Sequence, residues 1–183
     1  PGMVLDFYNM RRRDVEAASP NAAHQGLAQL EADFDVHIIT QNIDDLHERA
    51  GSSNVLHLHG EIFKMRSEMN DQLIYEIRND IRIGDLANDG AQLRPHIVWF
   101  EEAVPLIGPA SRLVNSADIF VVVGTSLLVY PAAGLIHYAD SRIQKFIVDK
   151  RIPYTPEIFN LRKIEKPATA GIGELISLLK ATV

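Results

Sequence analysis

The residues best suited to chemistry gather in one short stretch of the chain, positions 40–60. In chain order they are Gln41, Asn42, Asp44, His57 and His59. Amide and carboxylate groups form hydrogen bonds with sugar hydroxyls, and an imidazole with an unperturbed pKa of about 6.5 is a base at neutral pH. The stretch therefore predicts a site that binds a hydroxyl-rich ligand and moves a proton.

Two further polar turns follow apolar runs later in the chain. Gly124-Thr125-Ser126 comes directly after residues 118–123, and Asp149 comes directly after residues 146–148. Glycine lets a backbone approach a ligand closely, and the two hydroxyls that follow it can bond to ribose or phosphate. The alternative is that Gly124-Thr125-Ser126 only caps a helix.

The elements that must position these side chains alternate between strands and helices. Near-continuous apolar runs predict buried parallel strands at 36–39, 118–123 and 146–148. Apolar residues at helical spacing predict helices over 21–34, 110–117, 131–139 and 171–180. This alternation predicts an α/β fold with a doubly wound parallel sheet. Ligands of such sheets bind beyond the carboxyl ends of the strands, so we expect the polar turns to meet there.

Residues 61–93 break the alternation and are rich in charged and amide side chains. They include the turn-prone Asn88-Asp89-Gly90, and we expect a small lobe inserted into a single domain over residues 1–183. The segment has no histidine and no cysteine, so no zinc site is expected in it. Packing should hold the lobe together, through Leu73, Ile74, Tyr75 and Ile77.

Composition excludes several classes of protein. The net charge is −6 and no block of basic residues occurs, which argues against a nucleic-acid binder that neutralises phosphates. There are 0 cysteines, so neither disulfides nor a cysteine nucleophile can be proposed. No apolar run approaches the ~18 residues of a membrane span, and we expect a cytoplasmic protein. Residues 4–8 look like the middle of a helix, which indicates a fragment.

Several uncommon strings occur in an order that resembles the sirtuins. They are residues 40–51, His57-Leu58-His59-Gly60, residues 94–100, Gly124-Thr125-Ser126 and residues 130–134. Tyr8-Asn9-Met10-Arg11-Arg12 is similar to the bacterial class III branch, which includes desuccinylases and deacetylases. The resemblance implies a Rossmann-like fold, NAD as cofactor, and removal of acetyl, succinyl or malonyl groups from protein lysines. The products would be nicotinamide and O-acyl-ADP-ribose.

The resemblance also implies which residues bind the cofactor. They are Gln41, Asn42, Ile43, Asp44, Gly124, Thr125, Ser126, Asp149, Lys150, Arg151 and Ala168. Gln41 and Asn42 would hold the nicotinamide ribose, and Asp44 would accept from the carboxamide. The match at 149–151 is weaker than the others. The alternative for Asn42 and Asp44 is that they cap a helix starting near Leu46.

His59, with Asn42, is assigned to catalysis by the same resemblance. In the implied mechanism the acyl oxygen displaces nicotinamide, and the imidazole then deprotonates a ribose hydroxyl. A lone histidine is more often structural, and His57 is a nearby competitor. His59 is preferred because it directly precedes Gly60, as in the family pattern.

Substrate contacts are expected at two places. Val98 and Phe100 lie in an apolar segment that could receive the substrate peptide as an added strand, although its aromatic residues could equally be core. Tyr8 and Arg11 share a helix face and could bind the carboxylate of a succinyl or malonyl group. The alternative for Arg11 is a solvated basic stretch, because Arg12 and Arg13 follow it.

Three departures from the family pattern matter. First, no G-x-G-x-x-G loop occurs, so weaker cofactor binding is expected. Second, the cysteines that bind zinc in many members of the family have no counterparts here. Third, Glu101 stands where the family has glycine. We expect Glu101 to crowd the acyl-lysine or restrict the backbone, and so to reduce turnover. A rival hypothesis is therefore a catalytically silent module that binds nucleotide or acyl-peptide. Another is transfer of ADP-ribose to a protein nucleophile.

Overall fold

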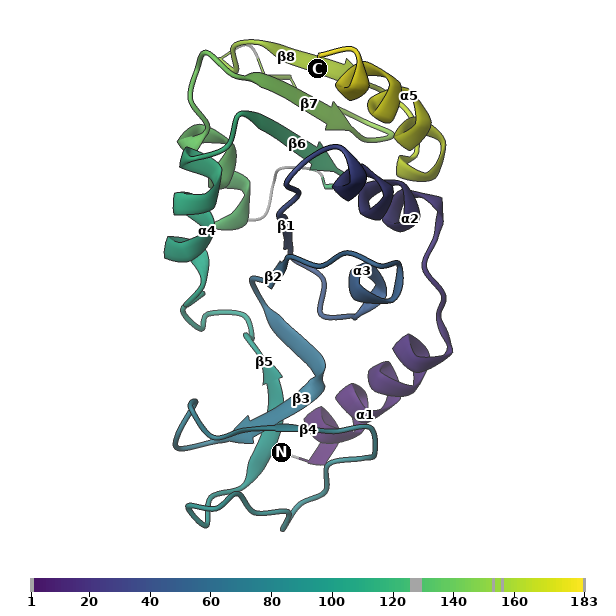
Figure 1. Ribbon diagram of the computed structural model, residues 1–183. Helices are drawn as coiled ribbons and strands as arrows, with labels where there is room; N and C mark the ends of the chain where they lie inside the picture. Colours follow the sequence, from purple (N-terminus) through teal and green to yellow (C-terminus); the bar gives the residue numbers. More distant parts are fainter. Residues whose placement is uncertain (1, 126–129, 153, 156, 183) are drawn as a thin grey trace.

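The computed structural model describes residues 2–125, 130–152, 154–155 and 157–182. In chain order its elements are α1 (Gly2–Ala17), α2 (Ala22–Gln29), η1 (Leu30–Ala32), β1 (Ile38–Thr40), α3 (Leu46–Arg49), β2 (Val55–His57), β3 (Gly60–Ser67), β4 (Ile74–Glu76), β5 (Leu93–Ile97), α4 (Ile107–Asn115), β6 (Ile119–Val123), η2 (Ala132–Tyr138), β7 (Gln144–Val148), β8 (Leu161–Ile164) and α5 (Ala168–Lys180). Parallel strands lie toward one end of the molecule and an antiparallel sheet lies at the other (Figure 1).

The parallel half contains two sheets among the described residues. β6, β7 and β8 pair in that order, with Val123 opposite Val148 and Val148 opposite Ile164. β1 pairs with β2, with Thr40 opposite His57. The three strands expected from the sequence are present, each shifted by only a few residues. β8 was missed because it is an edge strand whose middle residues face water, so it lacks an apolar run.

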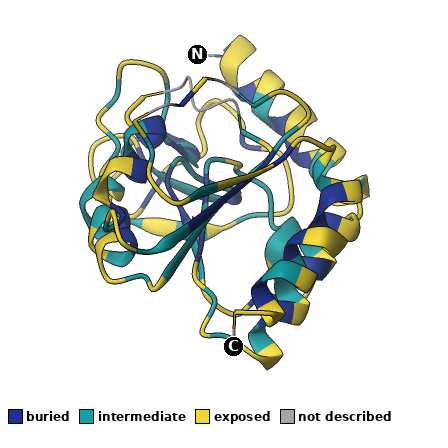
Figure 2. Cartoon of the chain, turned by 90° about the horizontal axis from the view of Figure 1, so that it is seen from above, coloured by how far each residue is buried: buried dark blue, intermediate teal, exposed yellow. Residues whose placement is uncertain are grey.

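Helices cover both faces of the larger parallel sheet, as the doubly wound prediction requires. Val121 and Val123 pack in a cluster with residues of α2, η1 and α5, while the alternate residues Phe120 and Val122 pack toward α4 and η2. Alternation along a strand sends successive side chains to opposite faces. The helices accordingly show a buried stripe and an exposed face (Figure 2).

Of two predicted helices, one differs from the structure in type and the other agrees with it at its start. The segment expected to be helical over 131–139 is a 3-10 helix over Ala132–Tyr138. Four of its first five residues are buried, so tight packing against β6, not a 3.6-residue period, determines it. α2 begins as predicted, at a capping box in which Asn21 Oδ1 accepts from Ala23 N (2.9 Å) and His24 Nδ1 accepts from Asn21 N (3.1 Å).

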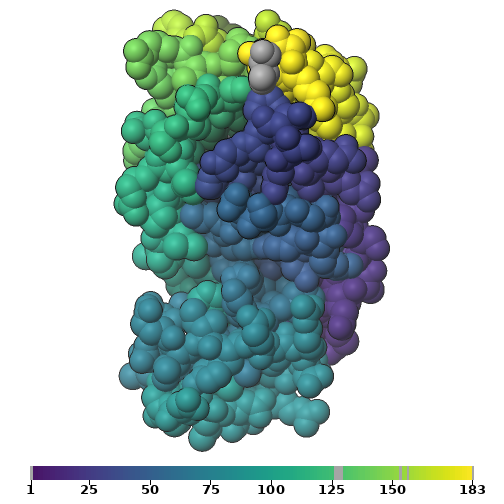
Figure 3. All heavy atoms as spheres, viewed as in Figure 1, coloured from purple at the N-terminus to yellow at the C-terminus, as the bar shows by residue number. Residues whose placement is uncertain are grey.

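The small lobe is an antiparallel sheet in the order β4-β3-β5, with α1 packed against β3 and β5. It forms one end of the molecule and the parallel half forms the other (Figure 3). Its core contains Leu5 of α1 together with Tyr75 and Ile77, which were expected to pack there. Ile74 is 43% exposed, so its predicted packing role is wrong: it lies on an edge strand that faces water.

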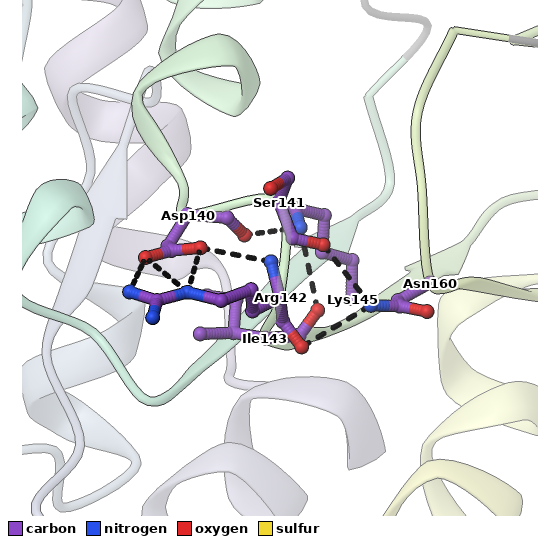
Figure 4. A network of polar contacts seen from close by, with 6 residues as sticks. All are labelled: Asp140, Ser141, Arg142, Ile143, Lys145 and Asn160. Atoms are coloured by element: carbon purple, nitrogen blue, oxygen red, sulfur yellow. Dashed lines mark hydrogen bonds and ion pairs between the residues drawn. The ribbon is translucent and has the colours of Figure 1, made fainter.

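The connection into β7 is held by a polar network at the end of the strand opposite the polar turns (Figure 4). Lys145 is buried and its Nζ donates to the Asp140 carbonyl (2.6 Å). Hydrogen bonds from Arg142 hold the pKa of Asp140 well below its ordinary value, and Asn160 Nδ2 donates to the carbonyls of Ser141 and Arg142.

Across the described residues, no helix is both long and apolar enough to cross a membrane.

Candidate active site

Gln41 joins three segments that are far apart in the sequence. It directly follows β1, and its side-chain Nε2 donates to Thr125 Oγ1, 3.4 Å away, in the turn after β6. Its backbone carbonyl lies 3.0 Å from Nδ1 of His59. The first polar turn, the imidazole and the hydroxyl turn therefore meet at the carboxyl edge of the parallel strands, where ligands of α/β sheets bind. Ser126 lies outside the described residues.

The hydrogen bond to Gln41 determines which nitrogen of His59 can act as a base. A carbonyl oxygen can only accept, so Nδ1 carries the proton in this bond. Nε2 then keeps its lone pair, and the half-buried ring is held in one orientation. This arrangement can accept a proton from a ligand hydroxyl.

His57 is engaged in the structure through both ring nitrogens. Nδ1 lies 3.3 Å from the Asn42 carbonyl, and Nε2 lies 2.7 Å from Glu48 Oε1. The side chain is only 7% exposed. Because both ring nitrogens already have partners within the protein, neither is available to a ligand. His57 ties the turn after β1 to α3, and His59 is the better candidate for proton transfer.

The turn after β1 combines free and occupied polar groups. Asp44 Oδ1 accepts from the N–H of Leu46, the first residue of α3 (3.1 Å), but the N-cap of this helix is Asp45, which makes no side-chain cap hydrogen bond. Asn42 is exposed, and its side chain makes no hydrogen bond to any described residue. The Ile43 carbonyl accepts from Ile62 N (2.7 Å) and ties this turn to the small lobe.

The turn after β6 has a left-handed glycine. Gly124 has φ 64°, and a Cβ added to it would meet no atom of a described residue within 4 Å. Glycine is therefore needed for the left-handed backbone and not for lack of space. Its N–H donates to the Val148 carbonyl (2.9 Å), which fixes the turn beside the end of β7.

The residues expected near the adenosine follow the next strand along. Asp149 Oδ1 accepts from Arg151 N (2.9 Å), and Lys150 and Arg151 are exposed. Ala168 is the first residue of α5. This group shares the carboxyl edge with Gln41, but within the described part of the chain no hydrogen bond links the two.

The segment expected to receive the substrate peptide runs beside His59. Val98 N donates to the His59 carbonyl (2.9 Å), and Gly60 pairs with Ile97. Gly60 has φ 83°, and a Cβ there would lie 2.0 Å from the His96 carbonyl oxygen. Only glycine fits this approach between β3 and β5.

Two aromatic residues at the end of this segment behave differently. Phe100 is 97% exposed, so it is not core. Trp99 packs with Ile62 and Ile97, so the core alternative holds for it. The turn then closes with a hydrogen bond from Glu102 N to the Trp99 carbonyl (3.1 Å).

Glu101 occupies the third position of this turn with φ 71°. Turns that require a positive φ at this position strongly prefer glycine, so the restriction expected at Glu101 lies in the backbone. Glu102 Oε2 accepts from Trp99 N (2.8 Å) and closes the turn a second time.

Tyr8 and Arg11 lie next to each other on α1 but differ in environment. The Tyr8 ring stacks near Trp99, with centroids 6.3 Å apart and planes 15° apart, and burial raises the pKa of its phenol. Arg11 is exposed, and its Nη1 lies 3.3 Å from Asp14 Oδ2.

Sequence reasoning missed the buried polar residues of α1. Arg12 is 1% exposed; it donates to the Ile62 carbonyl (2.9 Å) and to Asn9 Oδ1 (2.9 Å). Asn9 in turn exchanges two hydrogen bonds with the backbone of Ile81. The solvated basic stretch is thus wrong for Arg12, although Arg13 is exposed. The spacing of Leu5, Asn9 and Arg12 along one helix face was the available signal.

The fold and the site define an α/β protein in which polar turns and the His59 imidazole meet at the carboxyl edge of the parallel strands. The described residues hold no group of three His, Cys, Asp or Glu side chains that could bind a metal.

Comparisons with known proteins give the family. The Sir2 family model matches residues 3–131. The chain is 47% identical to an NAD-dependent protein deacylase of Bacteroides thetaiotaomicron, over 98% of this chain and 79% of that protein. It is 48% identical to an NAD-dependent protein deacylase of Helicobacter pylori, over 98% and 78%. The chain belongs to the Sir2 family.

Solved structures agree with this assignment. A Sir2 homolog in complex with NAD has a TM-score of 0.83 and 36% identity, over 97% of this chain and 72% of that one. A Sir2 protein bound to acetylated peptide has a TM-score of 0.75 and 29% identity, over 91% and 74%. The Rossmann-like fold predicted from the sequence is confirmed.

Proposed function

We propose that this chain is an NAD-dependent deacylase of lysine side chains in proteins. The observation that carries the proposal is the position of Gln41, which contacts both His59 and Thr125 at one sheet edge. Two relatives at nearly half identity are NAD-dependent protein deacylases, and related structures hold NAD and acetylated peptide.

The residues present fit the cofactor at its nicotinamide ribose. The free amide of Asn42 and the side chains of Gln41 and Asp44 offer donors and acceptors to hydroxyls and to a carboxamide. The Gly124 backbone and the Thr125 hydroxyl would face the cofactor from the turn after β6. Asp149 and Ala168 would lie toward the adenosine. When bound, NAD supplies the ribose carbon that accepts the acyl oxygen and the hydroxyl that receives the acyl group.

His59 performs the proton transfer in this scheme. Its Nδ1–H is held by the Gln41 carbonyl, so Nε2 takes the proton of the ribose hydroxyl. Asn42 orients the ribose beside it. The products are nicotinamide, the free lysine and O-acyl-ADP-ribose.

The substrate reaches the site along Val98 and Phe100. An added peptide strand gains affinity from its main chain with little demand on sequence, and Tyr8 with Arg11 would bind the terminal carboxylate of a succinyl or malonyl group. The proposed partners are acylated proteins of the cytoplasm, and not nucleic acid or membrane. A single domain with a small lobe at 61–93 is part of the same proposal.

Nicotinamide release from NAD tests the proposal, with peptides that carry acetyl-lysine, succinyl-lysine or unmodified lysine. Steady-state release should require an acylated peptide and should fall ~10²–10⁴-fold in His59→Asn, because the intermediate formed when nicotinamide leaves is then not consumed. Binding of acyl-peptide without release would favour the silent module, a hypothesis that the glutamate at 101 supports. ADP-ribose found on a protein side chain by mass spectrometry would favour the transferase.

A further inference from the structure

An ion pair between Arg94 and Glu102, here called the clamp, lies at the turn that ends the substrate segment. Arg94 Nη1 and Nη2 lie 2.8 and 3.2 Å from the two carboxylate oxygens of Glu102. Arg66 approaches the same carboxylate at 3.8 Å. Two parallel hydrogen bonds between a guanidinium and a carboxylate fix direction as well as distance. The side chain of Glu102 is therefore held in one place.

The clamp also fixes Trp99. The Arg94 guanidinium carbon lies 3.5 Å from the centroid of the indole, a cation–π contact. Glu102 Oε2 accepts from the backbone N–H of Trp99. The Glu102 carboxylate thus holds the Trp99 backbone directly and the Trp99 ring through Arg94.

Trp99 connects the clamp to both proposed substrate contacts. Its ring stacks near the Tyr8 phenol, and its backbone directly follows Val98, which is paired to His59. Arg94 Nε is buried without a hydrogen-bond partner in the described part of the structure. Unpaired buried donors are costly and call for an explanation other than stability.

The turn needs such a clamp because of Glu101. A residue with a side chain is disfavoured at φ 71° and persists there only when its surroundings enforce the conformation. Two hydrogen bonds between Glu102 and Trp99 enforce this conformation. Glu102 N donates to the Trp99 carbonyl, and Trp99 N donates to the Glu102 carboxylate.

We propose that Glu102 is a positioning residue for an acyl-lysine with an acidic acyl group. Arg94 holds its carboxylate, and the carboxylate in turn fixes the turn at 99–102 and the Trp99 ring. Val98 and Tyr8 are thereby placed to receive the substrate. This inference rests on the proposed function, and it goes further by assigning acyl selectivity to a side chain outside the contacts proposed for the acyl group.

The test uses Glu102→Gln, which keeps the shape of the side chain and removes its charge. Binding of a fluorescein-labelled succinyl-lysine peptide is measured by anisotropy without NAD. Kd should rise about tenfold, the factor that corresponds to ~1.4 kcal/mol, and the acetyl-lysine peptide should lose less. In turnover, KM for the succinyl peptide should rise while kcat stays within about twofold.

Trp99 is the only tryptophan of the chain, so its fluorescence reports on the clamp directly. Its emission should shift to the red in Glu102→Gln, because the ring loses its fixed contact with Arg94. The double variant Glu101→Gly with Glu102→Gln should recover most of the binding, since glycine adopts the turn without a clamp. Glu174→Gln, which breaks a surface pair with Lys166 (2.7 Å), is the matched control and should change nothing.

Unchanged affinity and unchanged emission in Glu102→Gln would overturn the inference, as would a wild-type chain that binds no acyl-lysine peptide. A double variant no better than Glu102→Gln would also overturn it. If the wild type binds the peptide as described but releases no nicotinamide, the proposed function fails while the positioning role stands.

Discussion

Replacing Glu101 by glycine should stabilise this protein. The residue has φ 71° in the turn that follows Trp99, and its side chain is exposed. For a residue with a Cβ, the left-handed region costs ~1–2 kcal/mol because Cβ approaches the following carbonyl oxygen. Glycine removes this cost but gives back about 0.4–1 kcal/mol through the greater freedom of the unfolded chain.

The net expectation is that Glu101→Gly raises the free energy of unfolding by about 0.5–1 kcal/mol. In a chain of this size, each kcal/mol corresponds to a rise in Tm of ~2–4 °C. Urea and thermal unfolding followed by circular dichroism would measure both quantities. We also expect Glu101→Gly to increase deacylation, because glycine adopts the turn at 99–102 without strain.

Two further variants isolate the backbone effect. Glu101→Ala removes the carboxylate and keeps the Cβ, so it should not stabilise the protein. Asn160 also has positive φ, 56°, but its side chain donates two hydrogen bonds, so Asn160→Gly should destabilise. If Glu101→Gly proves no more stable than Glu101→Ala, left-handed strain at this turn is refuted.

Three other predictions concern single side chains. Gly60→Ala should cost about 2–5 kcal/mol of stability, read from urea unfolding, because it adds left-handed strain to a clash with the His96 carbonyl. His59→Asn can still donate to the Gln41 carbonyl but has no base at Nε2, so turnover should fall ~10²–10⁴-fold with Tm nearly unchanged; full activity would exclude His59 as the base. Burial lowers the pKa of His24, so the folded protein favours the neutral imidazole. The resulting contribution to the free energy of unfolding is complete above about pH 6.5 and is lost as pH falls through the folded-state pKa. His24→Gln keeps the capping box and should weaken this acid sensitivity in unfolding measured from pH 7.5 to 5; an unchanged pH profile would contradict it.

Much of the fold could be read from the sequence because it depends on local patterns. The apolar runs ending before Gln41, Gly124 and Asp149 indicated buried parallel strands, and their ends indicated where polar turns would meet. The capping signal at Asn21 placed the start of α2 within one residue. Strand β8 could not be found in this way, because an edge strand with exposed charges has no apolar pattern.

Residue type and periodicity are properties of the chain, so the sequence showed which residues could do chemistry and in which order the elements carry them. The family pattern also favoured His59 over His57, and the tertiary structure supplied the physical reason, since the two differ in what lies around their ring nitrogens. The tertiary structure alone brought Arg94 to Glu102 and Trp99, and Arg12 into a buried position. Hydrogen bonds between segments depend on how the elements pack, and no periodicity in the sequence records them.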